Sequence, residues 1–480
     1  MHITSLPSKY GIGTLGKEAY EFADFLKKSG QRLWQILPIG PTSYGDSPYQ
    51  SFSSFAGNPL IIDLEELISK KLLTKAECDA CDFGSDDSKV NFEKQFNERY
   101  KLLKKAYSRF EKTSDFRAFC DREAYWLNDY ALYMKLKYEN NQKPWLSWKE
   151  DLINREWKAI DNAIWSDAEE IEYWKFIQYE FDLQYTKLKE YCNELNIEII
   201  GDLPIYVALD SADVWANPDV FQLDEDKCPK AVAGCPPDYF SKTGQLWGNP
   251  LYNWDYLKRT NYEWWIKRIK KQFERFDILR IDHFRAFDTY YSIPYGNKTA
   301  EKGEWKNGPG IEFFDTVKKS LGELKIIAED LGDLSPSVHE LLSKTGYPGL
   351  KILQFAFDGK NSDYLPHNHI KNCVVYTGTH DNDTTLGWFA TASKQAKKTY
   401  NEYFEPTKSQ APNEVLIKAA YMSVADTIII PMQDYLGLDT TARMNTPSTL
   451  GGNWEWRIDK KSLTKTMSEG ILHLAEIYCR

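Results

Sequence analysis

The chain has 480 residues, 42 % of them hydrophobic, which is typical of a globular protein with about two to four domains or one large barrel carrying insertions. Its formal net charge is −10 and it has no long basic run, which argues against nucleic acid as a partner, because phosphate binding needs clustered Lys and Arg. Aromatic residues make up 15 % of the chain, and aromatic faces suit flat apolar ligands or the CH faces of sugar rings.

The amino terminus reads MHITSLPSKYGIG and lacks a charged start followed by an apolar core. Nowhere do 18 apolar residues run together, so we expect a cytoplasmic protein with no membrane contact. Cys78 and Cys81 form a CxxC, but no second pair or nearby His completes a zinc set. We therefore expect reduced thiols and no metal.

Short apolar runs that end in polar or turn residues predict seven strands. They are 32–39, 198–207, 277–282, 324–330, 350–357, 372–379 and 426–434. Amphipathic segments such as 263–276 and 313–321 predict helices between most of them, and alternation of strand and helix favours a parallel sheet with covered faces. HITSL at the start could be the remnant of an eighth strand. The fold class expected is therefore α/β, a (β/α)8 TIM barrel with its site at the carboxyl ends of the strands.

Two segments depart from this alternation of strand and helix and mark the predicted domain boundaries. Residues 65–194 are rich in Lys, Glu, Tyr and Trp and predict a helical subdomain inserted after the barrel start, residues 1–64. Residues 195–480 are expected to complete the barrel. Within them, 210–254 reads as a loop insertion at the carboxyl ends of the strands, where long loops are commonly functional.

Three predicted strand ends carry an acid, namely Asp282 in LRIDHF, Glu329 in IIAEDLG and Asp381 in YTGTHDND. Neighbouring strands lie ~4.8 Å apart. Retaining glycosidases place their two carboxyls about 5 to 5.5 Å apart, one as nucleophile and one as acid. We expect Arg280 to keep Asp282 ionised, while apolar neighbours raise the pKa of Glu329. For each acid alone, a buried ion pair or a strand-end cap remains open.

Other chemistries find less support in the sequence. There is no GxxxxGK[ST], no GxGxxG after a strand and no GxSxG. His367 and His369 lie in an apparent loop without a third metal ligand.

Eight blocks, in order and over nearly the full length, resemble the 4-alpha-glucanotransferases of the amylomaltase or disproportionating type, glycoside hydrolase family seventy-seven of the alpha-amylase clan. The blocks are HITSLPSKYGIGTLG, WQILPIGPTSYGDSPYQSFSSFAGNPLIIDL, IIGDLPIYVALDSADVW, CPPDYFSKTGQLWGNPLYNW, LRIDHFRAF, IIAEDLG, YTGTHDNDT and ARMNTPSTLGGNW. Pro204 stands where the clan's hydrolases usually have Asn-His, which favours the amylomaltase branch over an amylase.

The resemblance implies Asp282 as nucleophile, Glu329 as acid/base and Asp381 as transition-state stabiliser. It also implies a set of sugar-binding residues. These are Tyr49, Asp213, Asp238, Trp247, Arg280, His283, His380 and Asn445. Malto-oligosaccharides, glucose and starch or glycogen-type alpha-1,4-glucans are the implied partners, without any cofactor.

Two departures from the family pattern stand out. Family members usually have a short apolar segment before the HITSLP block that completes the first strand, whereas here Met1 almost adjoins it. Cys235 stands where the family's loop usually has an aliphatic residue, and a thiol there is open to oxidation near the site.

Disproportionation of malto-oligosaccharides through a covalent glycosyl-aspartate intermediate is thus the expected function. A retaining alpha-glucan hydrolase is the alternative, because water can replace the sugar acceptor. A catalytically silent glucan-binding protein would also use an aromatic-rich surface, but the three acids at strand ends argue against it.

Overall fold

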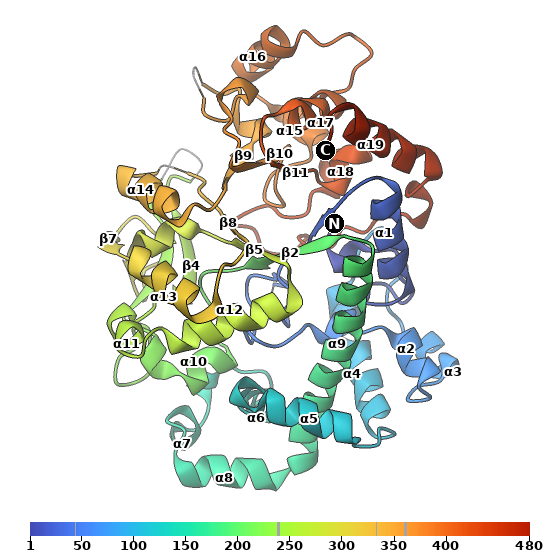
Figure 1. Ribbon diagram of the computed structural model, residues 1–480. Helices are drawn as coiled ribbons and strands as arrows, with labels where there is room; N and C mark the ends of the chain where they lie inside the picture. Colours follow the sequence, from blue (N-terminus) through green and yellow to red (C-terminus); the bar gives the residue numbers. More distant parts are fainter. Residues whose placement is uncertain (44, 238–240, 333, 360–361) are drawn as a thin grey trace.

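The computed structural model describes residues 1–43, 45–237, 241–332, 334–359 and 362–480. Seven parallel strands form its centre (Figure 1), one at each of the seven predicted positions. One sheet has the order β1-β2-β5-β8 and the other β11-β10-β9. Their bounds are β1 Leu33–Gln35, β2 Glu198–Leu203, β5 Ile278–Ile281, β8 Ile326–Ala328, β9 Gly349–Ile352, β10 Cys373–Tyr376 and β11 Thr427–Ile429. The fold is therefore α/β.

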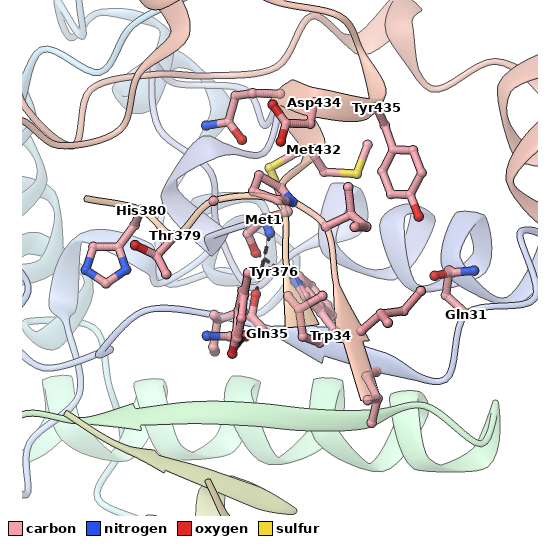
Figure 2. A pocket seen from close by; sticks show the side chains of 18 of the residues that line it. Met1, Gln31, Trp34, Gln35, Tyr376, Thr379, His380, Met432, Asp434 and Tyr435 are labelled. Carbon is pink, nitrogen blue, oxygen red and sulfur yellow. Dashed lines mark hydrogen bonds between the residues drawn. The ribbon is translucent and has the colours of Figure 1, made fainter. Parts of the chain in front are cut away.

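The two parallel sheets adjoin on one side only. Between β8 and β9, the N–H of Ala328 donates to the carbonyl of Pro348 at 2.9 Å. On the other side, β1 and β11 face each other across a cavity of about 220 Å³, which Figure 2 shows from close by. Among the described residues the hydrogen-bonded strands do not close into a barrel.

The prediction that HITSL is the remnant of an eighth strand is wrong. Ile3–Ser5 forms a 3-10 turn, in which the N–H of Ser5 donates to the carbonyl of His2 at 3.2 Å. Pro7 follows closely and has no N–H to offer a strand ladder. The first residue still reaches β1, because the amino group of Met1 donates to the carbonyl of Gln35 at 3.5 Å (Figure 2).

A third sheet is antiparallel and was not predicted. Its order is β4-β3-β6-β7, with β3 Ala231–Cys235, β4 Gln245–Pro250, β6 Thr289–Pro294 and β7 Glu304–Asn307. Within the predicted loop insertion 210–254, the structure has β3, β4, the short helix α10 Ala212–Ala216 and a 3-10 turn, none of which was predicted. Half of the pairing that fixes β3 comes from β6, which lies outside the segment and leaves no local signal within it.

Helices occupy most of the remaining chain (Figure 1). Helix α1 Lys17–Lys28 precedes β1. Between β1 and β2 the helices are α2 Leu64–Ser69, α3 Lys75–Asp79, α4 Phe92–Tyr107, α5 Ser114–Arg122, α6 Ala124–Glu139, α7 Glu150–Ile153, α8 Trp157–Ser166 and α9 Ala168–Glu194. After β2 they are α10 Ala212–Ala216, α11 Trp254–Arg259, α12 Glu263–Arg275, α13 Ile311–Leu321, α14 Pro336–Thr345, α15 Thr385–Thr391, α16 Lys394–Phe404, α17 Pro412–Met422, α18 Met432–Tyr435 and α19 Lys465–Ile477. The helices expected at 263–276 and 313–321 are confirmed as α12 and α13. In the described part of the chain, no helix is both long and apolar enough to cross a membrane.

The long helix α9 ties the helical segment to the loop after β1. The side-chain amide of Gln178 accepts from the N–H of Gly57 at 2.7 Å and donates to its carbonyl at 3.0 Å. One turn further along, the ring of Phe181 packs against Gly57 so closely that a Cβ built there would lie 2.1 Å from it. Glycine at position 57 therefore permits this close approach of loop and helix.

We expect Gly57→Ala to lower the free energy of unfolding by about 1–3 kcal/mol, because the added methyl group overpacks a buried contact. Urea unfolding followed by circular dichroism measures the change. Gly470→Ala in α19 is the matched control, since a Cβ there meets open space and alanine favours the helix. Equal midpoints for wild type and Gly57→Ala would contradict the packing argument.

Candidate active site

Two of the three predicted acids follow adjacent strands. Ile281 of β5 pairs with Ala328 of β8, and Asp282 and Glu329 come directly after them. The N–H of Glu329 donates to the carbonyl of Ile281 at 3.1 Å, which extends the ladder to the acid itself. Each of the two carboxyl groups acts on the pKa of the other. The prediction that these acids lie on neighbouring strand ends is therefore confirmed.

The buried guanidinium of Arg280 joins three carboxylates. Its side chain is 3 % exposed, and Nη1 donates to Oδ2 of Asp202 on β2. Nη2 donates to Oε2 of Glu329 at 2.6 Å and to Oδ1 of Asp282 at 3.4 Å. Burial disfavours its charged form, but Asp202 and Glu329 outweigh burial and raise the pKa of Arg280 above its usual value.

The expected electrostatic order of the two acids is wrong in this structure. Burial and the facing Glu329 raise the pKa of Asp282 well above its usual value, and Arg280 offsets this only in part. Burial also acts on Glu329, but Arg280 and the backbone N–H of His283 outweigh it and lower the pKa of that carboxyl. The cause is geometric, because Nη2 contacts Glu329 more closely than Asp282. The two carboxyls therefore differ in the direction of their pKa shifts, with Asp282 the weaker acid of the pair.

His283 adopts a left-handed backbone, with φ of 50° and ψ of 50°. This uncommon conformation turns its N–H toward Oε2 of Glu329, to which it donates at 3.0 Å. Its ring meets Trp247 of β4 edge to face, with centroids 5.0 Å apart. Burial lowers the pKa of His283 to about 4, so the ring is neutral at pH 7 and offers one donor and one acceptor.

Asp381 lies on the loop between β10 and α15. The side-chain amide of Asn445 donates to its Oδ1 at 2.6 Å, and Nη2 of Arg443 donates to its carbonyl at 2.7 Å. Nε2 of His380 lies 3.4 Å from the same Oδ1. About half of the Asp381 side chain is exposed, so the carboxylate is held in place and remains accessible to a ligand.

Aromatic rings wall the site beside Asp381. The ring of Tyr49 stacks on His380 with centroids 5.1 Å apart, and Trp454 lies 5.8 Å from Tyr49. The hydroxyl of Tyr49 donates to Oδ2 of Asp202 at 2.8 Å. The segment that carries Tyr49 is therefore joined to Asp202 by a hydrogen bond and to the loop of His380 by ring stacking.

Two predicted sugar contacts do not join this group. Asp213 on α10 is 4 % exposed, and its Oδ2 accepts from the N–H of Ser54 at 2.7 Å. It borders a separate cavity of about 160 Å³ that none of the three predicted catalytic acids lines. Asp213 thus holds the loop after β1 through its bond to Ser54. Burial raises the pKa of Asp213 to about 6. Asp238 lies outside the described residues.

Three residues of the site were missed from the sequence. Asp202 had a visible signal, because it is an acid inside the apolar run IIGDLP, and it pairs in register with Arg280. Arg443 and Trp454 reach the site from the ARMNTPSTLGGNW block, where only Asn445 was singled out. No local periodicity marks them. In the described ranges, no group of three or more His, Cys, Asp or Glu is arranged to hold a metal ion.

Comparison with known proteins gives one consistent family. The glycoside hydrolase 77 model, described as 4-alpha-glucanotransferase, matches residues 1–464. The 4-alpha-glucanotransferase of Clostridium butyricum is 52 % identical over 485 residues and covers 100 % of both chains. That of Thermus thermophilus is 46 % identical and covers 99 % of this chain and 97 % of its own. Among solved structures, the amylomaltase from Streptococcus agalactiae in complex with acarbose has a TM-score of 0.97 at 43 % identity and covers 100 % of this chain and 98 % of its own.

We predict that stability rises with pH between about pH 4 and 6.5 in part because of His283. In this window the unfolded chain protonates the ring near its ordinary value of 6.5, while the folded chain keeps it neutral until about 4. His283→Gln should reduce the slope of unfolding free energy against pH by up to one proton. Exposed His339→Gln serves as the control, and an unchanged slope in His283→Gln would contradict the assignment.

Proposed function

The chain belongs to the 4-alpha-glucanotransferase family of glycoside hydrolases and is an enzyme of that class, and from this premise we propose how its residues carry the reaction. The proposed substrates are alpha-1,4-glucans such as malto-oligosaccharides and starch or glycogen-type chains, with glucose or another glucan end as acceptor. We propose that the parallel strands correspond to a (β/α)8 barrel with a helical insertion at 65–194. A cytoplasmic location stays a prediction from the sequence.

The observation that carries the mechanism is the Asp282–Glu329 pair on adjacent strand ends. In the first step, an oxygen of Asp282 attacks the anomeric carbon, and Glu329 gives its proton to the leaving glycosidic oxygen. A covalent glycosyl-aspartate forms and the shortened glucan departs. In the second step, Glu329 takes the proton of the acceptor hydroxyl, and the hydroxyl oxygen attacks the anomeric carbon. The bond to Asp282 breaks, and the transferred sugar has its original anomeric configuration.

The protonation states of the two acids must match these roles before the sequence begins. Attack needs an ionised Asp282 and a protonated Glu329, whereas burial and the facing Glu329 raise the pKa of Asp282, and Arg280 and the N–H of His283 outweigh burial to lower the pKa of Glu329. The two acids follow adjacent strands, so a proton can pass between them. A donor glucan that displaces water and hydrogen-bonds the pair would select the reactive arrangement of the proton. The directions of the two pKa shifts alone would favour exchanged roles, and the residue that carries a trapped sugar distinguishes the two assignments.

The other residues have roles in positioning sugar. Neutral His283 can donate to or accept from a hydroxyl without adding positive charge beside the developing oxocarbenium ion. Asp381, with His380 and Asn445, is placed to bind ring hydroxyls and favour a distorted ring. Tyr49 beside His380 and Trp247 beside His283 offer aromatic surfaces near the acids. Hydrolysis is the competing outcome, since water can attack the same intermediate.

Asp282→Asn should reduce turnover of maltotriose at least about 10⁴-fold while leaving the fold intact, because it removes the attacking oxygen and keeps the shape. Product chain lengths resolved by chromatography measure turnover. Trapping with a fluorinated glycosyl fluoride, followed by peptide mass spectrometry, identifies the residue that carries the sugar. Label on Glu329 would exchange the two roles, and near-normal activity of Asp282→Asn would exclude it as nucleophile.

Trp247→Ala should lower transfer on the order of tenfold more than hydrolysis, because a sugar acceptor needs a stacking surface and water does not. Both rates are followed on maltotriose, with free glucose and longer products counted separately. Trp157→Ala is the control, since that indole is 76 % exposed on α8, in the helical segment. An equal fall in both rates would mean that Trp247 contacts the donor sugar or only supports the β4 segment that carries it.

A further inference from the structure

The segment of residues 377–385 runs from the end of β10 to the first residue of α15 and is called the 377–385 loop. It carries Asp381 and His380, and its residues 377–384 have no regular secondary structure. A loop of this length would sample many conformations unless it were bound to the scaffold. Its two ends are bound at one place. The binding group is the carboxylate of Asp434 on α18, the helix that follows β11.

Asp434 accepts hydrogen bonds from both ends of this loop. At the first end, the hydroxyl of Thr377 donates to Oδ2. At the other end, the N–H of Thr385 donates to Oδ1 at 2.7 Å and its hydroxyl donates to Oδ2 at 2.8 Å. One carboxylate therefore closes the loop over a span of nine residues. Figure 2 shows Asp434 bordering the same cavity as Thr379 and His380.

This carboxylate is costly to bury. Asp434 is 1 % exposed, and among the described residues it has no ion-pair partner. Burial raises its pKa, and its three donors only partly compensate the lost hydration. Loop closure alone could be achieved by a neutral acceptor at lower cost. Among the described residues, all side-chain hydrogen bonds of Asp434 go to this one loop. Because the carboxylate is buried at a cost in free energy to make them, the position of the loop is important.

The scaffold beneath Asp434 is itself fixed. The side-chain amide of Asn413 on α17 donates to the backbone carbonyl of Asp434 at 2.8 Å. The middle of the loop has separate supports, in that Gln354 donates to the carbonyl of Asp383 at 2.9 Å and Asn382 accepts from the N–H of Thr379 at 2.9 Å. Asp434 is thus the group that sets where the loop begins and ends.

We propose that Asp434 is a positioning residue, which holds both ends of the 377–385 loop so that Asp381 meets the sugar ring as the glycosidic bond breaks. This inference rests on the proposed function of Asp381. Because Asp381 acts most strongly on the distorted ring of the transition state, a displaced loop lowers kcat more than it raises KM.

Asp434→Ala should lower kcat on maltotriose by about 10²-fold, the scale of a displacement near 1 Å, with a smaller change in KM. Asp434→Asn should recover roughly tenfold of this loss, because its amide oxygen can accept from the N–H of Thr385 and threonine hydroxyls can rotate to accept from its NH2. Thr377→Val removes one donor and leaves Asp434 intact, so it tests the same connection if Asp434→Ala unfolds. For Thr377→Val we expect an intermediate loss of kcat.

The decisive measurement is a double-mutant cycle with Asp381→Asn, with single-turnover cleavage of an activated nitrophenyl maltoside as the readout. If Asp434 acts through Asp381, Asp434→Ala and Thr377→Val should each cost less than threefold once Asp381→Asn is present. Thr14→Val is the matched control. It removes a hydroxyl donor from another buried carboxylate, Asp63 at the start of α2, and should cost the same in both backgrounds.

Additive losses in the cycle would overturn the inference, as would a wild-type kcat in Thr377→Val together with Asp434→Ala. A wild-type enzyme that leaves maltotriose unchanged would overturn the proposed function and this inference with it. An active wild type with additive variants would overturn this inference alone.

Discussion

The site depends on one buried cation. Arg280 lies 3 % exposed among Asp202, Asp282 and Glu329, and the three carboxylates would repel one another without it. The register of the parallel strands brings the four groups together, because Asp202 pairs with Arg280 and the two acids follow adjacent strand ends. Removing the cation would leave several buried negative charges uncompensated, which costs more than the loss of any single hydrogen bond.

The cation does not balance all of the negative charge. Three carboxyl groups surround one guanidinium, and Asp381 adds a further acid nearby. His283 contributes no positive charge at pH 7, since burial lowers its pKa to about 4. Carboxyl groups in excess over cations favour a positively charged oxocarbenium-like transition state. The arrangement thus suits the proposed reaction.

The sequence predicted the parallel strands well, because strands buried on both faces read as continuous apolar runs. It also predicted that Asp282 and Glu329 adjoin. It failed at HITSL, where Pro7 and a 3-10 turn prevent a strand, and at β3, whose partner β6 lies about sixty residues away. The order of the two pKa values could not be predicted, because it depends on which carboxylate Nη2 of Arg280 approaches more closely.

The functional groups fall into two sets with different supports. Asp282 and Glu329 sit directly on strand ends, where the backbone ladder fixes them. Asp381, Tyr49 and Trp247 come from loops or the antiparallel sheet and need side-chain bonds to hold their positions. Bond making and breaking tolerates little displacement, and by the proposal above this includes Asp381, whose loop is held at both ends, whereas recognition of acceptors of varied length benefits from surfaces that can adjust. The fold therefore places the proposed reacting carboxyls on its most rigid elements and the proposed sugar-stacking rings, Tyr49 and Trp247, on segments that are held by a few polar contacts.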